Sequence, residues 1–412
     1  MPYAIVRNVA TCRWRCPLLL VTSLRERWKL FPFAALSASY CAHIGFFNPY
    51  LPLWLKDLGL SITLIGLLTA VQAVTRVLAP YGWGWLSDHT GERVKLLRFC
   101  AGAALVCSTG LLGAGGVGWI ALVLLMMFIH TSAMMSMSEA ALAHVVSTDQ
   151  GFDSRRYGRV RLWGSLGFLV TVFVAGAWFE THGMASFPAW SIGSLVLLNL
   201  SVWCLPNRKE ALHPEEERAP VMAVLRQREV QWLFATVFFH VLSHIGIYVF
   251  FSLYLDSLGY SKTMIGVLWA VSVGAEIIWF FTQSRWLPKF SLSQWLFICS
   301  ATMVVRMALT TWTADWLWAL LFAQVLHALT FATHHTACVA LLSHHFPGQL
   351  RGRGQALYAS IGYGLPGVLG ALVGGALSDV YGLTSVYAVS IVTALVACGC
   401  ARQCMRKNSI RE

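Results

Sequence analysis

The sequence predicts an all-α integral membrane protein with twelve transmembrane helices in two pseudo-symmetric six-helix bundles. Of its 412 residues, 57% are hydrophobic and only 12% are charged, with a mean hydropathy of +0.63. A water-soluble domain carries about 25% charged residues. In addition, residues 52–71 recur almost letter for letter as 252–271, at an offset of 200 positions. The composition therefore predicts a membrane protein, and the repeat predicts an internal duplication.

Twelve apolar segments are long enough to be transmembrane helices, since about 20 apolar residues cross a bilayer. The first six are expected at 30–52, 63–86, 95–114, 117–140, 160–179 and 188–205. The second six are expected at 231–254, 264–286, 292–313, 316–342, 354–377 and 384–401. The predicted organisation is a basic tail at 1–27, a bundle at 28–206, a polar linker at 207–229, a second bundle at 230–401 and a tail at 402–412.

A second internal echo supports a six-plus-six duplication. The sequence GAWFETHG at 176–183 is matched by GALSDVYG at 375–382, an offset of 199. The two pieces follow the fifth and eleventh apolar segments. Duplicated membrane bundles of this kind are typical of transporters.

The net charge of +12 is distributed as in a membrane protein and argues against a nucleic-acid role. Arg76 and Arg306 lie within apolar segments, and only Lys56 and Lys262 fall in the odd-numbered loops. The other 26 of the 30 Lys and Arg residues lie in the tails and near the loops after even-numbered segments. This positive-inside pattern places both termini in the cytoplasm, and we expect a multi-pass protein of a bacterial inner membrane.

The eleven cysteines are scattered and form no CxxC pair. Their only clusters fall at the expected cytoplasmic side, where thiols stay reduced. We therefore expect no disulfide, no metal site and no cofactor.

The loop between the second and third segments reads GWGWLSDHTGERVK and resembles the signature loop of the major facilitator superfamily. Asp88, Gly91 and Arg93 are among the matching positions. The resemblance implies a conformational gate, in which Asp88 at a helix end pairs with a loop arginine and Gly91 allows the tight turn.

Four charged residues are expected at membrane depth: Arg76, Glu139, Glu276 and Arg306. A charge at the helix centre costs about 2.5–3.5 kcal/mol on translocon scales. We therefore expect these side chains to face a central site, paired with one another or with a substrate. A structural ion pair is the alternative for any single one of them.

Helical spacing adds polar neighbours to this set. Gln72 lies one turn before Arg76, and Gln324, His327 and His334 form a stripe on the tenth segment. Glu276 is the expected proton carrier, because a buried carboxylate can be neutralised whereas arginine stays charged. We expect Arg306 to pair with Glu276 until a proton or an anionic substrate changes the pairing.

After residue 28 the chain resembles the branch of the superfamily that holds the phenylpropionate permeases and the oligosaccharide–proton symporters. The matching pieces are PYLPLWLKDLG (49–59), YGRVRLWGSLGF (157–168), Glu276, VVRM with Arg306, and His327. The resemblance implies proton coupling by Glu276, Arg306 and His327. In the sugar permeases the residues that match Glu139 and Arg161 bind sugar.

Two departures favour an aromatic acid over a sugar. Thr330 stands where sugar permeases carry a carboxylate, and His240 and His244 stand where they carry acidic residues. Arg76 and the RLWGS piece look closer to the phenylpropionate permeases, and a guanidinium binds a carboxylate in bidentate fashion. We therefore expect a proton-coupled symporter that imports a small organic acid such as 3-phenylpropionate by alternating access, with an oligosaccharide or nucleoside symporter as the alternative.

Other functional classes fit less well. Drug–proton antiporters carry an arginine within the fourth segment and a Gly-Pro motif in the fifth, and this chain has neither. An integral-membrane enzyme would be expected to carry an acid–base or metal cluster, for which THHT at 333–336 is the sole candidate. A sensor of the same fold would be told apart by solute uptake. We expect a non-enzymatic monomer whose partners are a small-molecule substrate, protons and the lipid bilayer.

Overall fold

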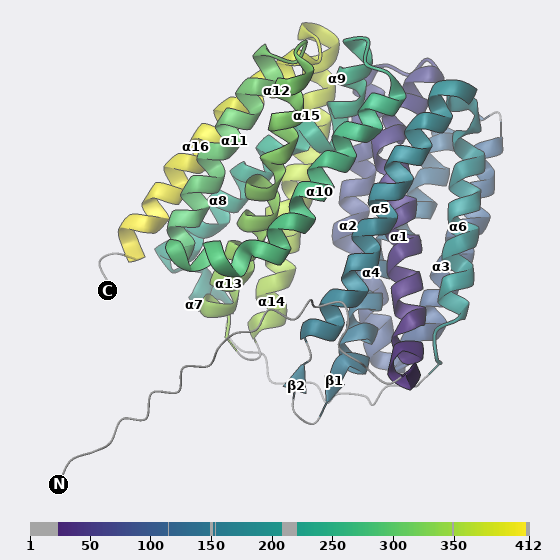
Figure 1. The fold of residues 1–412 in the computed structure, drawn as a ribbon, viewed down its shortest axis with the longest axis horizontal. Helices are drawn as coiled ribbons and strands as arrows, with labels where there is room; N and C mark the ends of the chain where they lie inside the picture. The colour runs from purple at the N-terminus through teal and green to yellow at the C-terminus, as the bar shows by residue number, and fades with distance from the viewer. Residues whose placement is uncertain are drawn as a thin grey trace.

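The computed structural model describes residues 24–113, 115–148, 151–152, 154–207, 221–347 and 350–408. Within these ranges twelve helical spans are long and apolar enough to cross a membrane. Their ends differ from the predicted ends by at most five residues, so the predicted all-α membrane fold is confirmed. Figure 1 shows the spans of the first half beside those of the second.

The first half has one continuous helix for most spans. The long helices are α1 (Leu24–Asp57), α2 (Ile62–Thr90), α3 (Arg93–Thr109), α4 (Val117–Val146), α5 (Ser154–His182) and α6 (Phe187–Trp203). Short 3-10 turns η1 (Gly110–Leu112) and η2 (Met184–Ser186) extend α3 and precede α6. Between α4 and α5, β1 (Ser147–Thr148) pairs antiparallel with β2 (Gly151–Phe152).

The second half has more interrupted spans. The seventh consists of α8 (Arg228–Ile245), η3 (Gly246–Phe250) and α9 (Phe251–Ser257), preceded by the short α7 (Val221–Leu225). The eighth and ninth are α10 (Lys262–Trp286), ending in the 3-10 turn η4 (Leu287–Lys289), and α11 (Leu292–Trp312). The tenth is α12 (Leu317–Val325), η5 (Ala328–Thr333) and α13 (His334–His345). The eleventh is α14 (Leu350–Leu357), η6 (Tyr358–Gly364) and α15 (Leu365–Tyr381), and the twelfth is α16 (Thr384–Asn408).

The predicted tails and linker fall largely outside the described residues. Residues 1–23, 208–220 and 409–412 are not described. At the C-terminus α16 continues to Asn408, so this helix runs into the region predicted as a tail. At the linker, the described chain resumes at α7 before the seventh span.

The first internal repeat has the same local structure in both halves. Gly59 and Gly259 adopt left-handed backbones with φ of 81° and 83°, which glycine adopts without steric cost. Two residues on, the hydroxyl of Ser61 accepts a hydrogen bond from the Leu64 N–H, and Ser261 caps the next helix in the same way. The repeated letters LG-S therefore encode a repeated turn and helix N-cap.

The most extensive packing between the halves is that of α5 on α10 and of α2 on α15, and α1 also contacts η3 and α9. We call the end of the bundle where α1 begins and α16 finishes the terminal end, and the opposite end the distal end (Figure 1). At the distal end Tyr50 donates to the Lys262 carbonyl of the other half, as well as to Val172 of its own half, and Lys56 pairs with Asp256 of the other half at 2.9 Å. These contacts close the distal end across the two halves.

Three π-helical segments interrupt spans of the second half: η3, η5 and η6. A π segment shifts the helical phase and is frequently found at functional sites. In this protein η3 and η5 take part in the buried polar cluster described below, since Tyr248 of η3 stacks on His244 and Thr330 of η5 contacts Arg306.

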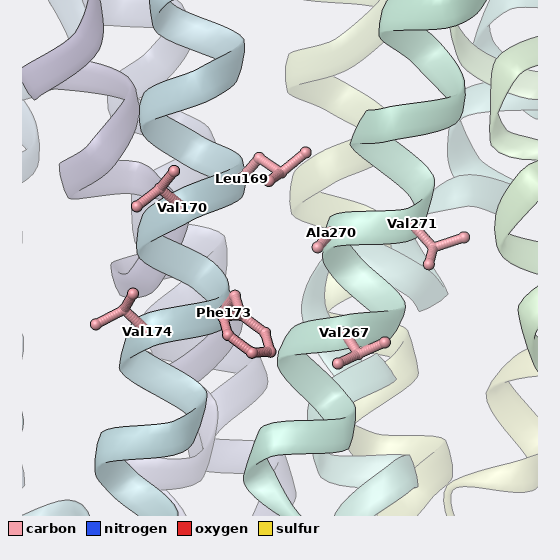
Figure 2. A pocket seen from close by; sticks show the side chains of 7 residues that line it. All are labelled: Leu169, Val170, Phe173, Val174, Val267, Ala270 and Val271. Carbon is pink, nitrogen blue, oxygen red and sulfur yellow. The ribbon is translucent and has the colours of Figure 1, made fainter.

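An apolar groove of about 400 Å³ lies between α5 and α10 (Figure 2). Its lining consists of Leu169, Val170, Phe173, Val174, Val267, Ala270 and Val271. Because these side chains offer no hydrogen-bonding group, the groove has no feature that would orient a charged or polar substrate.

Candidate functional site

The centre of the second half is a buried guanidinium. Arg306 on α11 has none of its surface exposed. Its Nη1 contacts His244 Nε2 at 2.9 Å, His327 Nδ1 at 3.2 Å and Thr330 Oγ1 at 3.0 Å. Its Nη2 donates to Gln324 Oε1 at 3.0 Å. The guanidinium is thus surrounded by uncharged acceptors, so its positive charge is not balanced by a bonded carboxylate.

The expected direct pairing of Arg306 with Glu276 is replaced by an indirect one. His327 lies between them, with its Nε2 at 3.5 Å from Glu276 Oε2. Because His327 Nδ1 accepts from Arg306, its Nε2 carries the ring proton and points it toward Glu276. The glutamate side chain retains 19% exposure, so it is accessible to solvent, unlike Arg306.

His244 and Thr330 are contacts of Arg306 that the sequence analysis did not assign to the site. His244 is the more informative of the two. It lies on α8 and stacks on Tyr248 of η3, with ring centroids 4.6 Å apart. The only sequence signal was its place on the seventh span, where a histidine replaces an acidic residue. Helix periodicity alone does not say that this position faces α11.

Of the predicted stripe on the tenth span, His334 is the member that does not contact Arg306. Gln324 and His327 contact Arg306, whereas His334 stacks on His240 with ring centroids 3.7 Å apart. The π segment η5 lies between His327 and His334 and changes the phase that an uninterrupted α-helix would have.

Arg76 lies on α2, deep among protein groups but with part of its surface exposed. It is within electrostatic range of Tyr40 on α1 and Tyr248 on η3, so it faces the interface of the two halves. Among the described residues, no carboxylate lies within salt-bridge distance of it. Gln72, one turn earlier, donates to Asn48 Oδ1 at 3.0 Å. Of the two arginines predicted at membrane depth, Arg76 and Arg306, Arg76 is therefore the one whose guanidinium is open to an added anion.

Glu139 and Arg161 form an ion pair at 2.6 Å between α4 and α5. Both line a small pocket walled by α1, α4 and α5. Arg161 is also within electrostatic range of Glu276 and of His335 on α13. This pair therefore extends the polar set of the second half into the first.

The loop predicted as a gate is described in part. Gly91 caps α2 with φ of 66°, and its N–H donates to the Ser87 carbonyl at 2.9 Å. Arg93 Nε donates to Ser87 Oγ at 3.1 Å. The tight turn at Gly91 is thus present, while the side chain of Asp88 lies outside the described residues.

The formal charges of this inner set do not cancel. Three guanidinium groups, on Arg76, Arg161 and Arg306, face two carboxylates, on Glu139 and Glu276. A net positive site inside a membrane bundle attracts an anion, because an uncompensated charge is costly at this depth.

Comparison with known proteins identifies the family of this chain. The family model described as the MFS_1 like family matches residues 35–389. The chain belongs to this family. It is therefore a major facilitator superfamily transporter and a multi-pass membrane protein, in agreement with its twelve spans.

Two curated relatives match most of this family member. It is 26% identical over 344 residues to the Escherichia coli (strain K12) protein named probable 3-phenylpropionic acid transporter, covering 82% of this chain and 87% of the relative. It is 25% identical over 348 residues to the maltose permease of Geobacillus stearothermophilus, covering 83% and 86%. The resemblance to the phenylpropionate and oligosaccharide branch is thereby confirmed.

Solved structures share the fold at low sequence identity. The nucleoside transporter NupG aligns with a TM-score of 0.76 at 13% identity, covering 93% of this chain and 99% of that one. A bacterial homologue of the human lysosomal transporter Spinster, solved inward-facing and occupied, aligns with a TM-score of 0.69 at 12% identity, covering 94% and 98%. These structures show the arrangement of the helices. The substrate is inferred from the site residues.

Proposed function

We propose that this protein is a proton-coupled symporter that imports a small organic acid, such as 3-phenylpropionate, by alternating access. It acts in a bacterial inner membrane with both termini in the cytoplasm, so that the terminal end is the cytoplasmic one. The observation that carries the proposal is the excess of guanidinium over carboxylate groups, with Arg76 open to an anion.

The substrate carboxylate would bind Arg76 at the interface of the halves. Tyr40 and Tyr248 lie within electrostatic range of that guanidinium and come from opposite halves. Their rings supply an amphipathic surface on which the aromatic body of the substrate can pack. This arrangement would select a molecule with a carboxylate at one end and an apolar ring at the other.

The proton would bind Glu276. Its carboxylate lies 3.5 Å from the ring Nε2 of His327, and His327 is held in the tautomer with its proton on that nitrogen by Arg306. A proton on Glu276 cancels one negative charge of the inner set, and one substrate carboxylate restores it. One-to-one symport therefore leaves the net charge of the site the same when empty and when loaded.

The equal net charge of the empty and the loaded site determines which gradient drives uptake. An anion that moves with one proton transfers no net charge, so a pH gradient drives uptake and a membrane potential alone does not. A gradient of one pH unit then supports about tenfold accumulation at equilibrium.

The direction of access follows from the closed distal end. Hydrogen bonds join the halves at that end, whereas Glu139 and Arg161 are exposed to solvent. This corresponds to the cytoplasm-facing state of the transport cycle. Rocking of the two halves about the inner site would expose it to the other side.

Oligosaccharide or nucleoside symport is the second candidate. It is favoured by the Glu139–Arg161 pair, which lines a pocket and offers the donors and acceptors that a polyol needs. The maltose permease relative supports the same interpretation. In that case Arg76 would be dispensable for substrate affinity.

The test is uptake of labelled 3-phenylpropionate into energised vesicles that carry the protein, with and without a proton-gradient uncoupler. Uncoupler-sensitive uptake supports the aromatic-acid symporter. Uptake of lactose or a nucleoside, with no uptake of 3-phenylpropionate, would move the function to the second candidate. Vesicles without the protein measure the passive permeation of the protonated acid.

A further inference from the structure

The second sequence echo places one carboxylate at the same position in each half. Glu180 lies near the end of α5 in GAWFETHG, and Asp379 lies near the end of α15 in GALSDVYG. The echo also repeats a glycine turn, since Gly183 and Gly382 have φ of 74° and 80°. Neither acid belongs to the inner polar set, because both lie at the distal end.

Each of these carboxylates binds the first turn of a helix in the opposite half. Asp379 accepts hydrogen bonds from the N–H groups of Ile62 at 3.2 Å and Thr63 at 2.9 Å, at the start of α2. Glu180 accepts a hydrogen bond from the N–H of Lys262, at the start of α10. The two contacts are related by the internal repeat: each half supplies one acid and receives the other.

The partners of the N–H groups at the start of α2 explain why an acid is needed there. The first four N–H groups of a helix have no partner within the helix. Ser61 accepts from the third of them, that of Leu64, so the local N-cap leaves the first two. Asp379 takes both. At α10, Ser261 likewise caps the Met264 N–H, and Glu180 takes the first.

We propose that Glu180 and Asp379 form a reciprocal latch that holds the distal end closed. They act as positioning residues, because the helices that they cap carry Arg76 on α2 and Glu276 on α10. The inference deepens the proposed alternating access: opening the distal end requires both carboxylates to leave their helix N-termini. The positive end of each helix dipole and the negative acid then separate into water.

The latch differs from an ordinary surface ion pair at the same end. Lys56 and Asp256 also join the halves; their side chains are accessible to solvent, as those of Glu180 and Asp379 are, and exposed ion pairs contribute little. The carboxylates instead accept hydrogen bonds from backbone N–H groups, whose positions are fixed by the helices. No donor side chain therefore has to be immobilised. The two acids should therefore set the balance between the two states.

The test measures the distance across the distal end by electron paramagnetic resonance. Spin labels are attached at Leu58→Cys and Leu258→Cys, which lie in equivalent turns of the two halves, after the eleven native cysteines are replaced. Each of Glu180→Ala and Asp379→Ala should raise the ratio of open to closed distances about fivefold, the effect of losing a typical cap. The double variant should raise it roughly 25-fold if the sites are independent. Asp57→Ala, an exposed acid at the same end, is the matched control and should change nothing.

Thermal unfolding of the same detergent-solubilised variants separates a latch from a purely structural role. Unchanged distances in the double variant overturn the inference, whether or not its melting temperature falls. Glu180→Gln and Asp379→Asn keep an acceptor oxygen without the charge and should give intermediate ratios. The distances are measured without substrate, so failure of the proposed organic-acid transport would leave this test intact, and the reverse also holds.

Discussion

Replacing Arg76 by glutamine tests whether this guanidinium binds the substrate carboxylate. Arg76 lies deep among protein groups with part of its surface exposed, and it faces the interface of the halves near Tyr40 and Tyr248. A hydrogen bond to a charged group contributes about 1.5–3 kcal/mol. Because 1.4 kcal/mol is a factor of ten, Arg76→Gln should raise the KM for 3-phenylpropionate by about 10- to 150-fold.

The assay is the concentration dependence of uncoupler-sensitive uptake in vesicles with matched protein content. Arg76→Lys is the control variant, since it keeps the charge and loses the bidentate geometry, and it should lie between wild type and Arg76→Gln. Inhibition by 3-phenylpropanol, which has the ring without the carboxylate, should be the same in all three proteins. A KM unchanged in Arg76→Gln would refute the assignment and favour the sugar or nucleoside function.

Three further perturbations test the coupling and the packing. Glu276→Gln cannot take up a proton, so it should abolish uncoupler-sensitive accumulation while exchange of labelled for unlabelled substrate continues; unaltered pH-dependent uptake would contradict the coupling scheme. Arg306→Met leaves the acceptor of Gln324 buried and unpaired and should lower the free energy of unfolding by roughly 3 kcal/mol in detergent, whereas an unchanged melting temperature would argue against the buried network. Gly66→Val should slow transport about tenfold, because a Cβ at Gly66 would lie 2.4 Å from the Ala371 carbonyl oxygen on α15. Gly82→Val on the same helix, where a Cβ meets nothing within 4 Å, should transport normally; equal rates would show that the α2–α15 contact does not limit the cycle.

The positions of the spans were predictable because they depend on local properties. A bilayer requires about 20 apolar residues and internal satisfaction of the backbone, so hydropathy alone locates the helices. The repeated turn at Gly59 and Gly259 was equally local, since a left-handed residue followed by a serine cap needs only neighbours in the chain. Within the candidate site, spacing alone placed Gln324 and His327 on one side of the tenth span, and both contact Arg306.

The partners of the buried groups were decided by the tertiary structure. Arg306 was expected to meet Glu276, yet His244 and His327 surround it, because the rotation of α8 and the π segment in the tenth span set which side chains face α11. The sequence also marked Glu180 and Asp379 only as members of an echo. Their hydrogen bonds join residues up to 317 positions apart. Hydrophobic periodicity reports which face of a helix avoids water, whereas the identity of the neighbour on that face depends on how whole helices pack.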